Sequence, residues 1–239
     1  MLTARNNGLM LGNPDNSFKP SLMVSGMTYL EAKPVPPTSG GGGGGGGGGA
    51  VPAAVETTAT TKRFAERMFS DIPSTAWFKE FVSNLISLDI IGGYPDGTFK
   101  PTQAMTRAEF AKMVCLAMGW ELQDPATPSF NDVAKAHWAY KYVETAKANG
   151  ALGGYGDGTI RPGKNITRAE VTKIVAECLK LTPSTNTFID THAHWARQHI
   201  DSCAGAVIID GYTDNTFRPD KTTTRAEAAK IVAGILDKK

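Results

Sequence analysis

The sequence predicts an all-α protein in which three tandem helix-loop-helix repeats form one body behind a glycine-rich linker. Two observations lead to this fold class. The same ordered set of polar and turn residues occurs three times, and the segments around each turn space their apolar residues as amphipathic helices do. Ten consecutive glycines at residues 40–49 separate this part from the residues before it.

The N-terminal part predicts no complete repeat. Residues 12–20 match the turn of the repeats, but Ser25 and Gly26 stand where a Thr-Arg pair would be expected. We interpret residues 1–38 as a degenerate half-repeat or the end of a missing upstream domain, and residues 39–65 as a flexible linker rich in Gly, Pro and Thr. The opening residues do not form a signal peptide, so a fragment or an atypical start is expected.

Each repeat is expected to begin with a Phe-x-Asp motif and a helix led by a tryptophan. In the first copy, Trp77, Phe81, Leu85 and Leu88 recur at helical spacing and mark one apolar face. A Gly-Tyr-x-Asp turn then ends this helix, since Asp-Gly and Asp-Asn pairs favour turns. A single unit of this size buries little surface, so the copies should stack into one body. The copies are assigned to residues 66–122, 127–181 and 185–239.

The second helix of each copy follows a Thr-Arg-Ala-Glu tetrad, which is a capping box. The threonine and the glutamate are explained by the cap, but the arginine is not. One interpretation is an ion pair with the turn acids Asp96, Asp157 and Asp214. The other is that guanidinium and free helix N–H groups converge on an external carboxylate or phosphate. In the second case, replacing the arginine should weaken binding and leave folding nearly untouched.

The ordered motifs over about residues 66–239 resemble the S-layer homology (SLH) domain family. The resemblance implies a pseudo-threefold spindle around a central helical bundle, located at the cell surface in the cell wall or S-layer. It further implies non-covalent anchoring of a surface protein by binding secondary cell-wall polymer in grooves between repeats. That polymer is an anionic polysaccharide, often with a pyruvylated sugar in Gram-positive members. The identity of the anchored cargo or lattice partner stays open.

The same resemblance implies which residues bind the polymer, although core packing is the alternative for each tryptophan. The third copy departs from the pattern, with Asp210 where the others have Gly92 and Gly153, so we expect its groove to fit the family least well. An aromatic face with a few polar anchors suits a carbohydrate. The implied residues are Arg107, Arg168, Arg225, Trp77, Trp138, Trp195, Gly93, Tyr94, Gly154, Tyr155, Gly211 and Tyr212.

Charge and hydropathy disfavour nucleic-acid and membrane functions. The chain has 25 Lys and Arg against 23 Asp and Glu, a formal net charge of +2, with no long run of like charge. Its apolar stretches are far shorter than the ~20 residues that a membrane helix requires. Neither nucleic-acid binding nor membrane insertion is therefore expected.

No metal, cofactor or catalytic site is predicted. The three cysteines are widely spaced and favour burial over a disulfide or zinc site. The Asp-Gly turns lack the ligands of an EF-hand, and His194 repeats the position of His137. No nucleophile or base departs from the repeat pattern, so we expect no enzyme unless a hydrolase domain has been lost upstream. The main alternative is a helical-repeat scaffold for protein–protein interaction.

Overall fold

The computed structural model describes residues 69–185 and 188–239, so the interpretations of residues 1–38 and 39–65 lie outside the described residues. Within the described ranges the secondary structure is helical, with isolated β-bridges and no strand, which confirms the all-α prediction. Each copy contributes two helices. They are α2 Lys79–Ser87, α3 Arg107–Met118, α4 Tyr140–Ala148, α5 Arg168–Leu179, α6 Arg197–Gly205 and α7 Arg225–Leu236.

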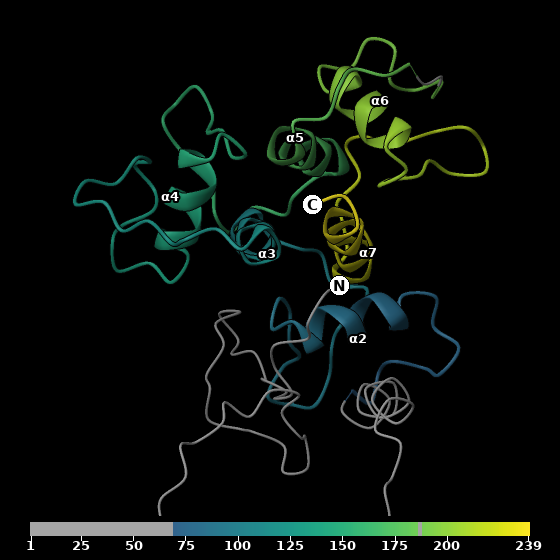
Figure 1. Ribbon diagram of the computed structural model, residues 1–239, viewed down its shortest axis with the longest axis horizontal. Helices are drawn as coiled ribbons and strands as arrows, with labels where there is room; N and C mark the ends of the chain where they lie inside the picture. The colour runs from purple at the N-terminus through teal and green to yellow at the C-terminus, as the bar shows by residue number, and fades with distance from the viewer. Residues whose placement is uncertain (1–68, 186–187) are drawn as a thin grey trace, which may run out of the picture.

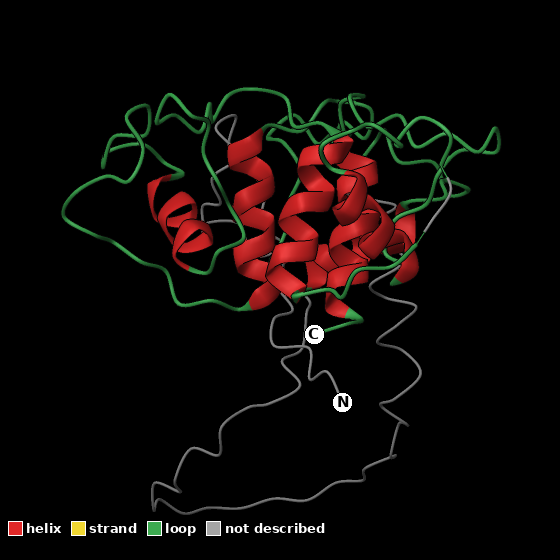
Figure 2. Ribbon diagram, turned by 90° about the horizontal axis from the view of Figure 1, so that it is seen from above, coloured by secondary structure: helices red, strands yellow, loops and turns green. Residues whose placement is uncertain are grey.

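The six helices form two layers around a pseudo-threefold axis. Figure 1 looks down this axis, with α3, α5 and α7 seen nearly end-on at the centre and α2, α4 and α6 outside them. In the perpendicular view the central helices stand side by side, and most loops gather along one edge (Figure 2). The expected spindle around a central helical bundle is confirmed.

Helices of neighbouring copies pack against each other more than helices of one copy do. The outer helix α4 packs against α3 of the preceding copy, and α6 packs against α5 in the same way. The outer helix of the first copy, α2, packs against α7 of the last, which closes the ring. No copy therefore has a complete core of its own, as its size suggested.

Backbone hydrogen bonds close a second ring where the central helices begin. The Met105 N–H donates to the Thr223 carbonyl, the Thr223 N–H to the Ile166 carbonyl, and the Ile166 N–H to the Met105 carbonyl, at 2.8–2.9 Å. All three residues are fully buried. Each copy thus holds both of the others immediately before its tetrad.

The predicted capping boxes are present in all three central helices. In α3 the Glu109 N–H donates to Thr106 Oγ1, and the Thr106 N–H donates to Glu109 Oε2 at 2.7 Å. The next two N–H groups are not free, because those of Arg107 and Ala108 donate to carbonyls of the following copy. The same holds for α5 and α7. The expectation that free helix N–H groups help to bind an anion is wrong.

The Phe-x-Asp motif fixes the loop between the two helices. The Asp71 carboxylate accepts hydrogen bonds from the Phe99 and Lys100 N–H groups at 2.8 and 2.7 Å. Lys100 has a φ of 57°, a left-handed conformation that is rare for residues with side chains. Asp132 and Asp190 make the same contacts in the other copies. The motif therefore stabilises an unfavourable backbone conformation at the residue before Pro101 and its equivalents, Pro162 and Pro219.

The three cysteines lie in the core, as predicted. Cys115, Cys178 and Cys203 are buried and unpaired, and burial raises the pKa of each thiol to about 12. Across residues 69–185 and 188–239, no helix is both long and apolar enough to cross a membrane.

Candidate functional site between the repeats

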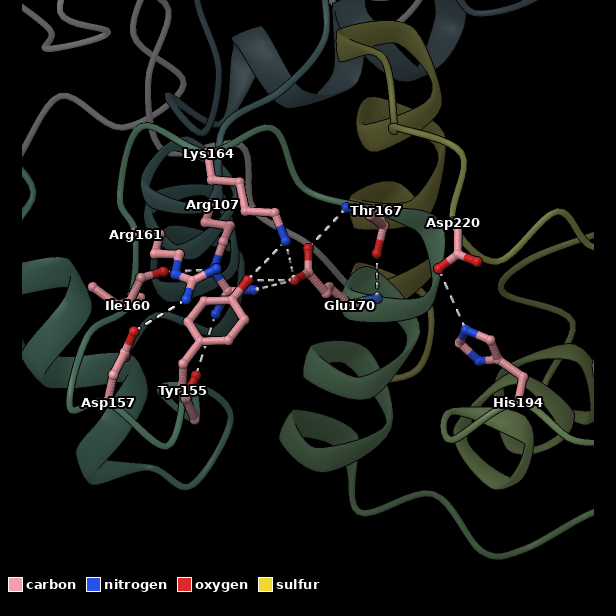
Figure 3. Close-up of polar contacts among 11 residues, drawn as sticks. Arg107, Tyr155, Asp157, Ile160, Arg161, Lys164, Thr167, Glu170, His194 and Asp220 are labelled. Carbon is pink, nitrogen blue, oxygen red and sulfur yellow. Dashed lines mark hydrogen bonds and ion pairs between the residues drawn. The ribbon is translucent and has the colours of Figure 1, made fainter.

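The tetrad arginines reach across the repeat boundary to the turn of the next copy. Arg107 Nε donates to the Ile160 carbonyl at 2.7 Å (Figure 3). Its Nη2 donates to the Gly153 carbonyl at 3.2 Å. The equivalent acceptors are Phe217 and Asp210 for Arg168, and Phe99 and Gly92 for Arg225. Since Arg225 of the last copy binds the first copy, the arginine contacts also join the three copies into a closed ring, as the helix packing and the backbone hydrogen bonds do.

These arginines are buried, which alters the expectation that folding would tolerate their loss. Arg225 is fully inaccessible, and Arg107 and Arg168 are nearly so. Burial lowers the pKa of Arg168 and Arg225 from the ordinary value of an arginine, and tyrosine and acidic side chains partly oppose this effect. A buried guanidinium bonded to two carbonyls is structural, whatever else it contacts.

The expected ion pairs between these arginines and the turn acids are not formed. Asp157 instead pairs with Arg161 at 3.0 Å within its own turn. Asp214 pairs with Arg218 at 2.9 Å, and Asp96 with Lys100 at 3.2 Å. The turn acids therefore stabilise their own loops.

Glu170, the glutamate of the second Thr-Arg-Ala-Glu tetrad, contacts Arg107 and the polar side chains next to it (Figure 3). Its Oε1 accepts a hydrogen bond from the Tyr155 hydroxyl at 2.6 Å and lies 3.3 Å from Lys164 Nζ and 3.2 Å from Arg107 Nη1. Burial alone would raise the pKa of Glu170, but the Tyr155 and Thr167 hydrogen bonds and the two cations hold it below its usual value. This glutamate is therefore a carboxylate at neutral pH.

The network differs among the copies. In the third copy, Lys221 Nζ contacts both the Tyr212 hydroxyl at 2.7 Å and Glu227 at 3.2 Å. The first copy has Gln103 at the lysine position, and this amide donates to the Tyr94 hydroxyl at 3.0 Å. There Arg225 Nη1 is buried without a hydrogen-bond partner among the described residues. The Nε and Nη2 groups of the three arginines therefore make equivalent contacts, whereas the surroundings of Nη1 differ between Arg107 and Arg225.

The glycines of the Gly-Tyr turns are explained by packing. A Cβ on Gly93 would lie 1.7 Å from the Phe69 ring, and one on Gly211 would lie 2.1 Å from the Phe188 ring. Gly154 faces Phe130 in the same way, at 2.5 Å. Each glycine thus lets the phenylalanine of the Phe-x-Asp motif pack directly on the turn backbone.

The tryptophans fall into two groups. Trp77 and Trp195 are 57% and 59% exposed, so core packing does not account for them. Trp138 is half-buried against the core, and Lys112 Nζ lies 5.9 Å from the centre of its ring. The histidine before each of the last two tryptophans accepts the N–H two residues later, at 3.1 Å for His137 and 3.2 Å for His194. This shared helix-start contact explains why the histidine recurs.

One cavity brings together predicted site residues from all three copies. It has a volume of about 290 Å³ and lies along α7, with Ile208, Ile209 and Ile231 among the lining residues. Trp77 comes from the first copy, Arg168 from the second, and the Asp210–Tyr212 turn from the third. Lys230 of α7 also lines it and pairs with Asp210 at 2.6 Å. We call the group Trp77, Arg168, Asp210, Tyr212 and Lys230 site 3.

The pseudo-threefold symmetry relates site 3 to two further groups of residues. Each group again takes its tryptophan, its arginine and its turn from three different copies. Site 1 comprises Trp138, Arg225, Gly92, Tyr94 and Lys112, and site 2 comprises Trp195, Arg107, Gly153, Tyr155 and Lys173.

Two kinds of residue at these sites were not predicted from the sequence. The glutamate of the tetrad was assigned to the cap alone, although the second oxygen of Glu170 and of Glu227 also binds polar groups of its own turn, and that of Glu170 contacts Arg107 of the preceding copy. The lysine six positions after each tetrad threonine was not considered, yet it recurs in register, as the tyrosines do. These lysines are Lys112, Lys173 and Lys230. Among the described residues, no group of His, Cys, Asp or Glu is arranged to hold a metal ion.

Comparison with known proteins identifies relatives of the repeat region. A cellulosome-anchoring protein of Acetivibrio thermocellus is 30% identical over 75% of this chain and 41% of its own length. An S-layer protein of Bacillus licheniformis is 29% identical over 73% of the chain and 20% of its length. A protein described as an uncharacterized cell wall amidase of Bacillus anthracis is 31% identical over 70% and 32%. The chain matches only 7% to 41% of the length of these and similar curated relatives.

A family model agrees with the repeats seen in the structure. The model described as S-layer homology domain matches residues 69–111, 129–172 and 187–229, each running from a Phe-x-Asp motif into a central helix. The chain therefore belongs to the S-layer homology domain family, which anchors proteins to the cell wall at the cell surface.

Proposed function

We propose that the three-repeat body anchors a surface protein non-covalently by holding secondary cell-wall polymer at sites 1 to 3, and that this polymer is anionic, with a pyruvylated sugar as the recognised group. The convergence of Trp77, Arg168 and Tyr212 on one cavity is the observation that carries the proposal. A cavity with an apolar base and an exposed indole suits a sugar ring, and the arginine and lysine that recur at each of the three sites suit an anionic polymer.

The buried arginines position the turns that form the proposed sites and contribute less to direct ligand contact. Nε and Nη2 of each arginine hold the neighbouring turn and the arginines are buried, so direct contact with the ligand falls to the tryptophan and to the central-helix lysine, Lys173 at site 2 or Lys230 at site 3. The glycine-tyrosine turns would place the aromatic rings of Tyr94, Tyr155 and Tyr212 at the sites. The ligand-binding role of all twelve residues implied by the resemblance remains a prediction.

We also propose that this part of the chain has no catalytic activity of its own. The amidase and an endoglucanase of a Bacillus strain match over only 32% and 18% of their own lengths, so their names concern proteins with much additional sequence.

Sedimentation of the full chain with purified cell walls tests the proposal. We expect binding to native walls and its loss after acid extraction of the secondary polymer. Trp77→Ala and Trp195→Ala should each weaken binding several-fold without lowering the melting temperature, because both side chains are more than half exposed. Leu122→Ala removes an exposed apolar side chain outside site 3 and is the control.

Two outcomes would contradict the proposal. Binding that survives extraction of the polymer would point to peptidoglycan as the ligand. Binding to neither preparation would favour the alternative of a protein–protein interaction scaffold.

A further inference from the structure

The three sites differ at one position that contacts the lysine. Site 3 has Asp210, whereas sites 1 and 2 have glycine there. The Asp210 carboxylate lies 2.6 Å from Lys230 Nζ, so the ammonium of site 3 already has an anionic partner.

The corresponding ammonium of site 2 has no such partner. A Cβ placed on Gly153 would lie 3.7 Å from Lys173 Nζ, so this ammonium stands over the glycine where a side chain would begin. No hydrogen bond or ion pair joins Lys173 to another of the described residues. Site 2 thus presents an ammonium at the position where site 3 presents an ion pair.

The surrounding charges reinforce the difference. Site 2 and its network contain the cations Arg107, Lys164 and Lys173 and the single carboxylate Glu170. Site 3 and its network contain three equivalent cations but two carboxylates, Glu227 and Asp210. A ligand carboxylate would be attracted to site 2 and would meet a like charge at site 3.

We propose that Asp210 acts as a built-in anion that excludes the carboxylate of the wall glycan from site 3, whereas the glycine of site 2 leaves Lys173 available to bind it. This inference rests on the proposed function and assigns its anion specificity to one position. The Asp210 carboxylate occupies the place that the ligand carboxylate takes at site 2. Site 3 is left to neutral parts of the polymer.

Asp210 can be changed with little expected effect on the fold. Lys230 and Asp210 are both substantially exposed, and such surface pairs contribute little to stability. The Asp210 group that Arg168 uses is the backbone carbonyl, which every substitution retains. Position 153 is equally permissive, since a Cβ there makes only ordinary contact with Lys173.

Titration calorimetry of the full chain tests the proposal with a hexosamine glycoside that carries a pyruvate ketal. The methyl ester of the same ketal provides a neutral probe of nearly the same shape. We expect Asp210→Gly and Asp210→Asn to add an acid-binding site or to tighten the weakest one about tenfold. Gly153→Asp should weaken acid binding about tenfold and leave the ester unaffected. Asp124→Asn, which removes an exposed carboxylate away from these sites, is the control.

The outcomes separate this proposal from the proposed function. If the wild-type chain binds walls and the ketal acid but neither position 210 nor 153 changes the stoichiometry or affinity, the role of Asp210 is overturned and wall anchoring stands. Equal binding of acid and ester by every variant would also overturn it. A wild-type chain that binds neither walls nor ketal would overturn both proposals.

Discussion

The central and outer helices of this protein differ in length, capping and burial, although every repeat contributes one helix of each kind. The central helices α3, α5 and α7 each have 12 residues, begin with a full capping box and are buried on most sides. The outer helices α2, α4 and α6 each have nine residues, and their N-cap side chains make no capping hydrogen bond. The central helices keep the arginine, glutamate and lysine of their first two turns constant, while the outer helices and the turns vary.

The difference follows from how each layer is packed. A central helix touches neighbours from other copies, so changes in its first turn would disturb the backbone ring and the turn of the next copy. An outer helix has one buried face and one face toward solvent. Variation that alters ligand recognition can therefore accumulate in the outer layer and turns at low cost, as Asp210 and Gln103 illustrate, which stand where other copies have glycine and lysine.

The largest expected effect comes from breaking the inter-copy contact of the central layer. Arg225→Ala should lower the free energy of unfolding by about 3 kcal/mol or more, because two charge-assisted hydrogen bonds are lost and the carbonyls of Gly92 and Phe99 lose that donor. For a chain of this size the melting temperature should fall by roughly 6–12 °C. Thermal unfolding followed by circular dichroism measures the change.

Arg161→Ala is the matched control for this prediction. Its guanidinium is half exposed and pairs with Asp157 in its own turn, so its loss should cost less than about 1 kcal/mol. Equal effects of the two substitutions would contradict a special role for the buried arginines.

The capping boxes provide the next contrast between the layers. Thr167→Ala should cost about 1 to 2 kcal/mol, because the Glu170 N–H loses its acceptor at the start of α5. Ser87→Ala, which removes an exposed hydroxyl from the last turn of outer helix α2, should be nearly neutral. Urea denaturation would compare them, and a neutral Thr167→Ala would mean that inter-copy contacts alone start the central helices.

The ends of the outer helices should yield a smaller, stabilising effect. Val207, in the segment after α6, has a φ of 58° and is 78% exposed, an unfavourable conformation for a β-branched residue. Gly150 holds the equivalent position after α4 with a φ of 73°. Val207→Gly should raise the free energy of unfolding by about 1 kcal/mol, less the entropic cost of glycine.

The reverse exchange tests the same point. Nothing lies within 4 Å of a Cβ placed on Gly150, so Gly150→Val should lower stability through backbone strain and not through a clash. If both exchanges lower stability, backbone conformation does not control the ends of the outer helices.

The smallest expected effect is the acid response of the turns. Hydrogen bonds from the Thr159 hydroxyl, Arg161 and the Thr159 N–H lower the pKa of Asp157 from 3.8 to about 2, and the same kinds of contact lower that of Asp214 to about 2. Because the folded pKa lies below the unfolded value, their stabilisation is present above about pH 4 and is lost as the pH falls through 2. A double variant, Asp157→Asn with Asp214→Asn, should therefore show a shallower decrease in melting temperature over this range. An unchanged slope would assign acid sensitivity to other groups.

Local features of this structure could be predicted, and contacts between distant residues could not. The capping box was predictable because Thr106 and Glu109 are three residues apart and their contact needs only a helix. The partner of Arg225 was not predictable, since the Gly92 carbonyl lies 133 residues away in sequence. Three equivalent tetrads gave no indication that each arginine serves the next copy.

The candidate site shows the same division. Repetition identified the tryptophans, the tyrosines and the arginines, and it also contained the overlooked Lys173 and its equivalents. The repetition did not reveal that Trp77, Arg168 and Tyr212 line one cavity, because this arrangement depends on the packing of α2 against α7. The burial of the arginines likewise follows from ring closure, which no single repeat encodes.

Differential scanning calorimetry of the full chain tests most directly whether the three copies form one closed body. Because every outer helix packs on a neighbouring copy and Arg225 joins the last copy to the first, residues 69–239 should unfold in a single transition. Its van't Hoff enthalpy should equal the calorimetric enthalpy. Two or three resolved transitions, or a calorimetric enthalpy that is a multiple of the van't Hoff value, would show that the copies fold independently and would contradict this account.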